Sequence, residues 1–161
     1  LADNPRTQLA DWHRAFMQEK IDGRLHPQAM RLVQQHLDAG DLCCVVTATN
    51  SFVTRPIVNA FGIEHLVATE PATENNQPGA NFTGGIAGIP SFKEGKITRV
   101  NDWLSGLGLR LESIEQSFFY SDSINDLPLL EKVTNPVATN PDARLRPEAE
   151  KRNWPILELF H

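Results

Sequence analysis

Apolar residues recur along the first part of the chain at the spacing of a helix. Leu9, Trp12 and Phe16 share one face of residues 6–20, which predicts an amphipathic helix there. Gly23 interrupts the pattern, and Pro27 opens a second helical stretch that runs over residues 27–40. The same periodicity predicts further helices over residues 52–61, 97–107, 126–132 and 141–152.

Short apolar runs without helical spacing separate these helices and predict strands. The run "LCCVV" at residues 42–46 is rich in valine, as expected for a strand buried on both faces of a parallel sheet. Residues 71–90 hold much Asn, Gly and Pro, which predicts irregular structure and a small hairpin that turns at Gly84 and Gly85. The other predicted strands cover residues 65–68, 117–120, 136–138 and 156–159.

The alternation of strands and helices predicts an α/β fold, with a mostly parallel, Rossmann-like sheet that carries helices on both faces. In such a sheet, ligands bind at the carboxyl ends of the strands. Two polar segments occupy such ends: "TATNS" at residues 47–51 and "SDSINDL" at residues 121–127. We therefore expect the functional residues in these two loops.

The composition narrows the class of protein. The chain has 161 residues, 40% apolar and 22% charged, which is typical of an ordinary globular protein. A net charge of −5 disfavours nucleic acid or an anionic membrane surface as the main partner, and no apolar run has the length of a transmembrane span. Cys43 and Cys44 point to opposite faces of a predicted strand, so we expect free thiols in a reducing cytoplasm.

Two carboxylates follow the aromatic strand at residues 117–120. Asp122 and Asp126 repel each other unless a proton or cation lies between them, and Mg²⁺ is a hard cation that uses few protein carboxylates. Taken alone, this pattern slightly favours a simpler role, with Asp126 at the N-terminus of the next helix and Asp122 as a turn residue. A calcium EF-hand does not fit, because Leu127 and Val133 stand where that loop needs Gly and Glu.

A hydroxyl ends the first buried strand. Thr47, with the backbone N–H groups of Ala48 and Thr49, could hold a phosphate oxygen near the start of the next helix. A capping Thr is the simpler alternative, although Asn50 and Ser51 are better placed to cap that helix.

A lysine begins the helix predicted over residues 97–107. Lys96 is unfavourable beside the positive end of a helix dipole, unless it neutralises nearby carboxylates or phosphate. Lys93 lies close by and could serve instead, and a plain surface lysine also fits the sequence at this stage.

The order of these segments resembles the haloacid dehalogenase superfamily of Mg²⁺-dependent phosphohydrolases, in its phosphoserine-phosphatase-like branch (subfamily IB). The similarity rests on "VVTATNSFVTRPI", "EGKITRV" and "YSDSINDLPLLEKV", which are similar to the family's second, third and fourth motifs. The segment "NPVATNPDARLRPEAEKRNWPIL" is similar to its closing strand, helix and strand. The resemblance runs from about residue 25 to the end of the chain.

The resemblance implies a role for each candidate. Thr47 would bind the transferring phosphoryl group, Lys96 would steady it, and Asn125 would donate a hydrogen bond near it. Asp122 and Asp126 would bind Mg²⁺. The substrate would be a small phosphorylated metabolite such as phosphoserine or histidinol phosphate, and the reaction would pass through an aspartyl-phosphate. The resemblance gives no oligomeric state.

One part of the family pattern is missing from this sequence. The motif DxDx[TV], which supplies the nucleophilic aspartate at the end of the family's first strand, does not occur. Residues 1–26 resemble the end of the family's helical cap, and residues 27–161 its core without the first strand. We therefore expect a truncated chain that is inactive alone. A non-catalytic module that binds Mg²⁺ or phosphate is the alternative.

Overall fold

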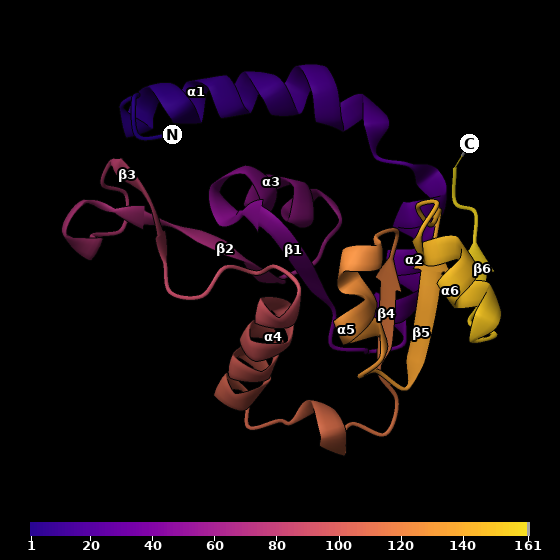
Figure 1. Cartoon of the computed structure of the whole chain (residues 1–161). Coiled ribbons are helices and arrows are strands. Elements are labelled where there is room, and N and C mark those ends of the chain that lie inside the picture. Colours follow the sequence, from indigo (N-terminus) through magenta and orange to yellow (C-terminus); the bar gives the residue numbers. More distant parts are fainter. Residues whose placement is uncertain (161) are drawn as a thin grey trace. The chain divides into compact units, whose positions relative to one another are not determined.

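The computed structural model describes residues 1–160, and the chain packs into two compact units. Unit 1 comprises Leu1–Ser91, and unit 2 begins at Phe92. In Figure 1, unit 1 runs from indigo to magenta and unit 2 continues through orange to yellow. Each unit contains its own three-stranded sheet.

Unit 1 contains a mixed sheet in the order β1-β2-β3. Strand β1 (Cys44–Asn50) pairs in parallel with β2 (His65–Thr73), and β3 (Phe82–Ala87) pairs with β2 in the antiparallel direction. Helix α3 (Ser51–Ala60) connects β1 to β2 and packs against β2. Val58 of α3 and Ala68 of β2 are fully enclosed, so the core of this unit lies between that helix and the sheet.

The first predicted helix is shorter and less regular than expected. Helix α1 (Arg6–Phe16) continues into a π-helical turn, Met17–Ile21, and a short 3₁₀ turn, Asp22–Arg24. Helix α2 (Pro27–Asp38) begins at the predicted proline and is followed by Gly40 at φ +80°. A left-handed glycine after a helix is the usual way for the chain to turn away.

Helix α1 is attached to the rest of unit 1 by aromatic and polar contacts. The Arg6 guanidinium carbon lies 4.7 Å from the ring centroid of Phe52 and 4.0 Å from that of Phe82. Further along α1, the His13 ring lies 2.9 Å through Nε2 from the carbonyl oxygen of Val53. These contacts join α1 to the start of α3 and to the start of β3, and burial lowers the pKa of Arg6.

Two predictions for unit 1 are wrong in detail. The segment 47–51, expected as a loop, belongs largely to β1, although the pairing register shifts between Val46 and Asn50. Such a shift leaves the intervening residues outside the regular ladder of hydrogen bonds. Polar residues are tolerated at these positions, and their polarity favoured the prediction of a loop. The hairpin expected over residues 82–87 is instead the single strand β3, because its partner is β2, which extends to Thr73.

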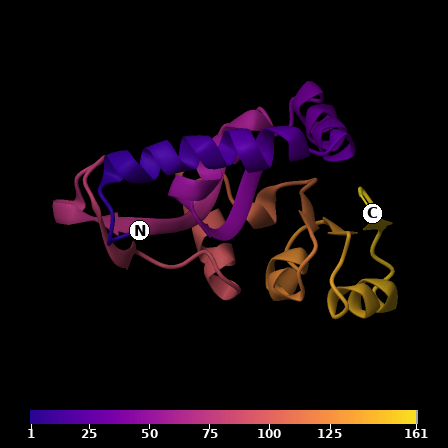
Figure 2. The same ribbon diagram turned by 90° about the horizontal axis from the view of Figure 1, so that it is seen from above.

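Unit 2 contains a parallel sheet in the order β4-β5-β6. Its strands are β4 (Phe118–Ser121), β5 (Asn135–Thr139) and β6 (Ile156–Leu157), and its helices are α4 (Glu94–Gly106), α5 (Leu127–Leu130) and α6 (Leu145–Lys151). Figure 2 shows α5 and α6 on the same face of this sheet. Leu130, Ala138, Leu145 and Ala149 form the buried cluster between them.

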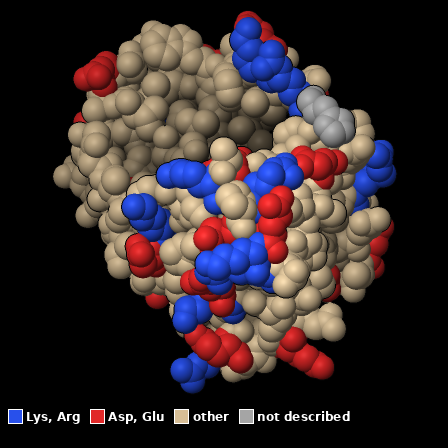
Figure 3. All heavy atoms as spheres, turned by 45° about the vertical axis from the view of Figure 1, so that its right-hand side comes forward, with Lys and Arg blue, Asp and Glu red and all other residues tan. Residues whose placement is uncertain are grey.

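The prediction of a mixed α/β fold with parallel strand pairs is confirmed. Within residues 1–160 the strands form two three-stranded sheets, so β1 and β4 are each an edge strand of their own sheet. Basic and acidic side chains are interspersed on the face in Figure 3, in agreement with ion pairs such as Arg152 with Glu131 and Glu148. Among the described helices, none is both long and apolar enough to cross a bilayer.

Lys93 has a strained backbone conformation directly before α4, at φ 49° and ψ −123°. Glycine adopts this region without a Cβ penalty, whereas other residues pay a cost in it. We expect Lys93→Gly to raise the free energy of unfolding by about 1 kcal/mol, measured by urea denaturation. Lys93→Ala removes the charge but keeps the Cβ, so equal stabilisation by both variants would contradict the strain argument.

Candidate active site

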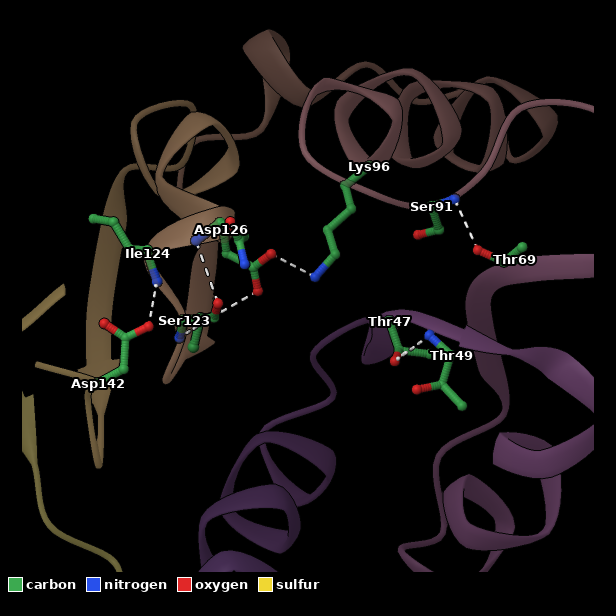
Figure 4. A network of polar contacts seen from close by, with 11 residues as sticks. Thr47, Thr49, Thr69, Ser91, Lys96, Ser123, Ile124, Asp126 and Asp142 are labelled. Carbon is green, nitrogen blue, oxygen red and sulfur yellow. Dashed lines mark hydrogen bonds and ion pairs between the residues drawn. The ribbon is translucent and has the colours of Figure 1, made fainter. Parts of the chain in front are cut away.

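A buried ion pair lies at the carboxyl end of β4. Lys96, in the first turn of α4, places its Nζ atom 2.5 Å from Oδ1 of Asp126, which follows β4 in a 3₁₀ turn, Ile124–Asp126. The two residues are only 6% and 8% exposed, respectively. Figure 4 shows the lysine side chain extending from its helix toward the carboxylate. Charged side chains are rarely buried this fully unless they are paired. Lys96 and Asp126 therefore depend on each other to remain charged in the interior.

Two serines brace the loop that carries Asp126. The hydroxyl of Ser121, the last residue of β4, donates to Oδ2 of Asp126 at 2.7 Å and accepts from the backbone N–H of Ser123 at 3.2 Å. Ser123 in turn accepts from the backbone N–H of Asn125 through Oγ and from that of Asp126 through its carbonyl oxygen. Both carboxylate oxygens of Asp126 therefore have a hydrogen-bonding partner, and contacts within the loop stabilise its conformation.

Asp142 holds the same loop from outside. Its Oδ1 accepts from the backbone N–H groups of Arg144 and Leu145, and its Oδ2 accepts from that of Ile124. Partial desolvation alone would raise the pKa of Asp142, but these backbone donors outweigh it, and the pKa lies below its ordinary value. The carboxylate therefore stays charged at neutral pH and continues to accept all three hydrogen bonds.

Asp122 differs from Asp126 in its surroundings. It is exposed, and within residues 1–160 its carboxylate forms no hydrogen bond or ion pair. A free carboxylate at a strand end fits Mg²⁺, which takes one or two protein carboxylates and completes its shell with water and phosphate oxygens. In the described part of the chain, no cluster of three or more His, Cys, Asp or Glu side chains could hold a metal alone. A further oxygen ligand would have to come from elsewhere.

The other predicted loop lies in unit 1. The hydroxyl of Thr47 accepts from the backbone N–H of Thr49 at 3.1 Å, and Ala48 and Thr49 are exposed. Asn50 caps α3, because its Oδ1 accepts from the backbone N–H of Val53 at 3.0 Å. Thr47 is thus not the cap of that helix, and its hydroxyl proton can be donated to a ligand.

The structure distinguishes Lys96 from Lys93, the two lysines that the sequence offered for one role. Lys96 is buried and paired with Asp126, whereas Lys93 is exposed and its ammonium lies 5.4 Å from the ring centroid of Phe92. The structure therefore brings Lys96, Asn125 and Asp126 into one network with Asp122 in the same loop. Thr47, Ala48 and Thr49 belong to the other compact unit.

Three residues of this network are not among the candidates that the sequence predicts: Ser121, Ser123 and Asp142. The two serines alternate with the candidate residues in "SDSIND", and small hydroxyl residues at a strand end were a usable signal of local backbone contacts. Asp142 lies three residues before α6, and its side chain accepts from the backbone N–H groups of Arg144 and Leu145 as a capping aspartate does. Its second contact, with Ile124, has no signature in the sequence.

The two cysteines are free thiols, as expected, and their environments disfavour the thiolate. Burial raises the pKa of Cys44 to about 12, and burial and Asp41 raise the pKa of Cys43 as well. Because the thiolate is the reactive form, neither thiol is suited to nucleophilic work.

A family model described as haloacid dehalogenase-like hydrolase matches residues 3–131. The match covers most of the chain, and the chain belongs to this family. The matched residues include the segments that resemble the family's second and third motifs, and the Asp122–Asp126 loop of the fourth.

Its curated relatives include phosphatases. A histidinol-phosphatase of Neisseria meningitidis serogroup C (strain 8013) is 45% identical over 159 residues, which cover 99% of this chain and 70% of that protein. Phosphoserine phosphatase SerB1 of Mycobacterium tuberculosis (strain ATCC 25618 / H37Rv) is 34% identical over 141 residues, covering 88% and 44%. Both relatives are named as phosphatases, and the chain spans less than half of the mycobacterial one.

Solved structures agree with this placement. The chain matches a crystal structure of a protein with unknown function from Bordetella pertussis Tohama I with a TM-score of 0.94 and 52% identity, over 99% of this chain and 70% of that one. It matches a substrate-bound phosphoserine phosphatase complex with a TM-score of 0.59 and 17% identity, over 81% and 57%. At that identity, the second likeness shows the shared fold alone.

Proposed function

We propose that the protein, in its full length, is a Mg²⁺-dependent phosphomonoesterase that acts on a small phosphorylated metabolite. The observation that carries the proposal is the buried Lys96–Asp126 pair, next in the loop to the unpaired carboxylate of Asp122. A charged pair is expensive to bury, and the exposed carboxylate of Asp122 in the same loop is available to a cation. Family membership supplies a reaction that uses both features.

In this proposal, the side chains of this sequence that bind the metal lie in the loop after β4. Asp122 binds Mg²⁺ directly, and Asp126 contributes either directly or through a water molecule, because Lys96 and Ser121 already contact its two oxygens. Lys96 keeps a positive charge at this position and offsets the charge of the phosphate. Asn125 donates a hydrogen bond from its side-chain amide near the phosphate. When bound, Mg²⁺ would draw negative charge away from the phosphoryl group.

The C-terminal part of β1 provides the proposed phosphate contacts of unit 1. Thr47 donates its hydroxyl proton to a phosphate oxygen, since its own oxygen already accepts from the N–H of Thr49. The backbone N–H of Ala48, an exposed residue, is proposed as a further donor. Neutral donors of this kind bind a phosphoryl group without adding a competing charge.

The nucleophile of the proposed reaction is an aspartate outside this sequence. Its carboxylate oxygen attacks phosphorus, the bond from phosphorus to the ester oxygen breaks, and the leaving oxygen takes a proton from a general acid that the same missing motif supplies. Water then hydrolyses the aspartyl-phosphate to inorganic phosphate and regenerates the carboxylate. The lack of DxDx[TV] in the sequence and the greater length of the relatives support this view. Residues 1–26 then belong to the helical cap, and residues 27–161 to the core.

Among small phosphorylated metabolites, the relatives favour a substrate like histidinol phosphate over one like phosphoserine. The relative named histidinol-phosphatase is 45% identical over 159 residues, compared with 34% over 141 residues for the phosphoserine phosphatase. The higher identity, over nearly the whole chain, supports the first class of substrate.

The test is phosphate release by the full-length protein from histidinol phosphate and phosphoserine, with and without Mg²⁺. We expect release that requires Mg²⁺, stops with EDTA and is faster with histidinol phosphate. Equal release in EDTA would contradict the metal requirement. Binding of Mg²⁺ without turnover of any monoester would instead favour a non-catalytic module.

The intact mass of the natural protein decides whether this sequence can be tested alone. A mass well above 18.0 kDa would mean that further residues accompany this sequence and could supply the nucleophile. A mass equal to it would leave the sequence without the aspartate that the reaction needs. Phosphate release should then appear only after a segment with the DxDx[TV] motif is added.

A further inference from the structure

Asp142 contacts two chain segments at once. It lies between β5 and α6, and through Oδ1 it accepts from the backbone N–H groups of Arg144 and Leu145, each at 2.8 Å. Its carbonyl oxygen accepts from the N–H of Arg146 at 3.0 Å. These are the contacts of a residue that caps the start of a helix. They need only one of the two carboxylate oxygens.

The remaining groups of Asp142 go to the loop after β4. Oδ2 accepts from the backbone N–H of Ile124 at 3.1 Å, and the backbone N–H of Asp142 donates to the carbonyl oxygen of Asp122 at 2.7 Å. Figure 4 shows the carboxylate of Asp142 turned toward Ile124. One residue therefore holds the loop at two points, on either side of Ser123.

The two points flank the residues that the proposed function uses. Asp122 carries the free carboxylate, and Asn125 and Asp126 follow Ile124 directly. Ser121 and Ser123 brace the loop internally, but both belong to the loop and the strand that leads into it. The contacts of Asp142 instead attach the loop to the start of α6, whose Leu145 and Ala149 are fully buried. A rigid core element thus fixes the direction of the loop backbone.

We propose that Asp142 is a positioning residue that holds the Asp122–Asp126 loop in its metal-binding conformation. This inference rests on the proposed function. Outer groups that orient metal ligands change metal affinity and activity by about 10–100-fold when they are removed. Asp142 acts on Asp122 through the backbone, so its loss should affect the Mg²⁺ requirement more than the rate at saturating Mg²⁺.

The test is Asp142→Asn in the full-length protein, with Ala149→Gly as the matched control. Asn keeps one acceptor oxygen but turns an NH₂ group toward a backbone N–H donor, so one of the two segments loses its partner. Ala149→Gly weakens α6 and its packing without touching the loop. We expect D142N to raise the Mg²⁺ concentration for half-maximal activity by about 10-fold or more, and A149G to leave it within about twofold.

Hydrogen exchange of the Ile124 amide gives a readout that does not depend on activity. Faster exchange of that amide in D142N, but not in A149G, would support the inference together with the shifted Mg²⁺ requirement. An unchanged Mg²⁺ requirement in D142N would overturn it and leave Asp142 as a helix cap. A wild-type protein with no Mg²⁺ binding and no phosphate release would overturn the proposed function itself, and this inference with it.

Discussion

Asp122→Asn is expected to reduce Mg²⁺-dependent phosphate release by the full-length protein by about 100-fold or more. The substitution keeps the size of the side chain but removes the charge of the only carboxylate in this loop that is unpaired within the described residues. A neutral amide binds Mg²⁺ weakly compared with a carboxylate. The measurement is the initial rate of phosphate release over a range of Mg²⁺ concentrations.

Asp102→Asn is the matched control for this prediction. Asp102 is an exposed carboxylate on α4, and its replacement changes the net charge by the same amount. We expect its activity to stay close to that of the wild type, and both variants to keep the wild-type melting temperature. Full activity in D122N would remove Asp122 from the metal site and with it the main argument for the proposed function.

Lys96→Met is expected to lower the free energy of unfolding by about 3–5 kcal/mol. Methionine fills a similar volume, but Asp126 then remains buried at 8% exposure without its cation. Its hydrogen bond from Ser121 persists and offsets only part of the lost interaction. The measurement is urea denaturation followed by circular dichroism, at neutral pH.

A double variant separates the buried charge from the loss of a well-packed side chain. Lys96→Met together with Asp126→Asn leaves no buried charge, so we expect it to be more stable than Lys96→Met alone, although inactive. A double variant that is less stable than the single one would show that packing of the lysine stem, and not its pairing with Asp126, determines stability at this position.

Most elements of the fold could be predicted from the sequence, because apolar spacing and Gly or Pro positions are local signals. Pro27 and Gly40 marked the limits of the second helical stretch, and α2 begins at that proline. The errors arose where pairing decides the outcome. Residues 82–87 form one strand, and not a hairpin, because they pair with the extended end of β2. The local sequence of a strand does not indicate which segment of the chain it pairs with.

In the candidate site too, local features could be predicted from the sequence, and contacts between distant segments could not. Asp122, Asn125 and Asp126 were singled out together because strand, loop and helix follow one another in a short segment. The choice between Lys96 and Lys93 required the burial and the ion pair that only the fold provides. Asp142 was missed because it contacts Ile124, 18 positions away, through a backbone N–H that every residue but proline possesses.

The packing of Arg6 determines when the first helix can fold during synthesis. Arg6 stacks on Phe52 and Phe82, and its backbone N–H donates to Asn81, 75 positions later in the chain. A nascent chain that ends before Asn81 lacks two of these three partners, Asn81 and Phe82. Helix α1, which precedes these partners along the chain, is therefore among the last elements of unit 1 to complete its docking, and until then its apolar face is available to chaperones.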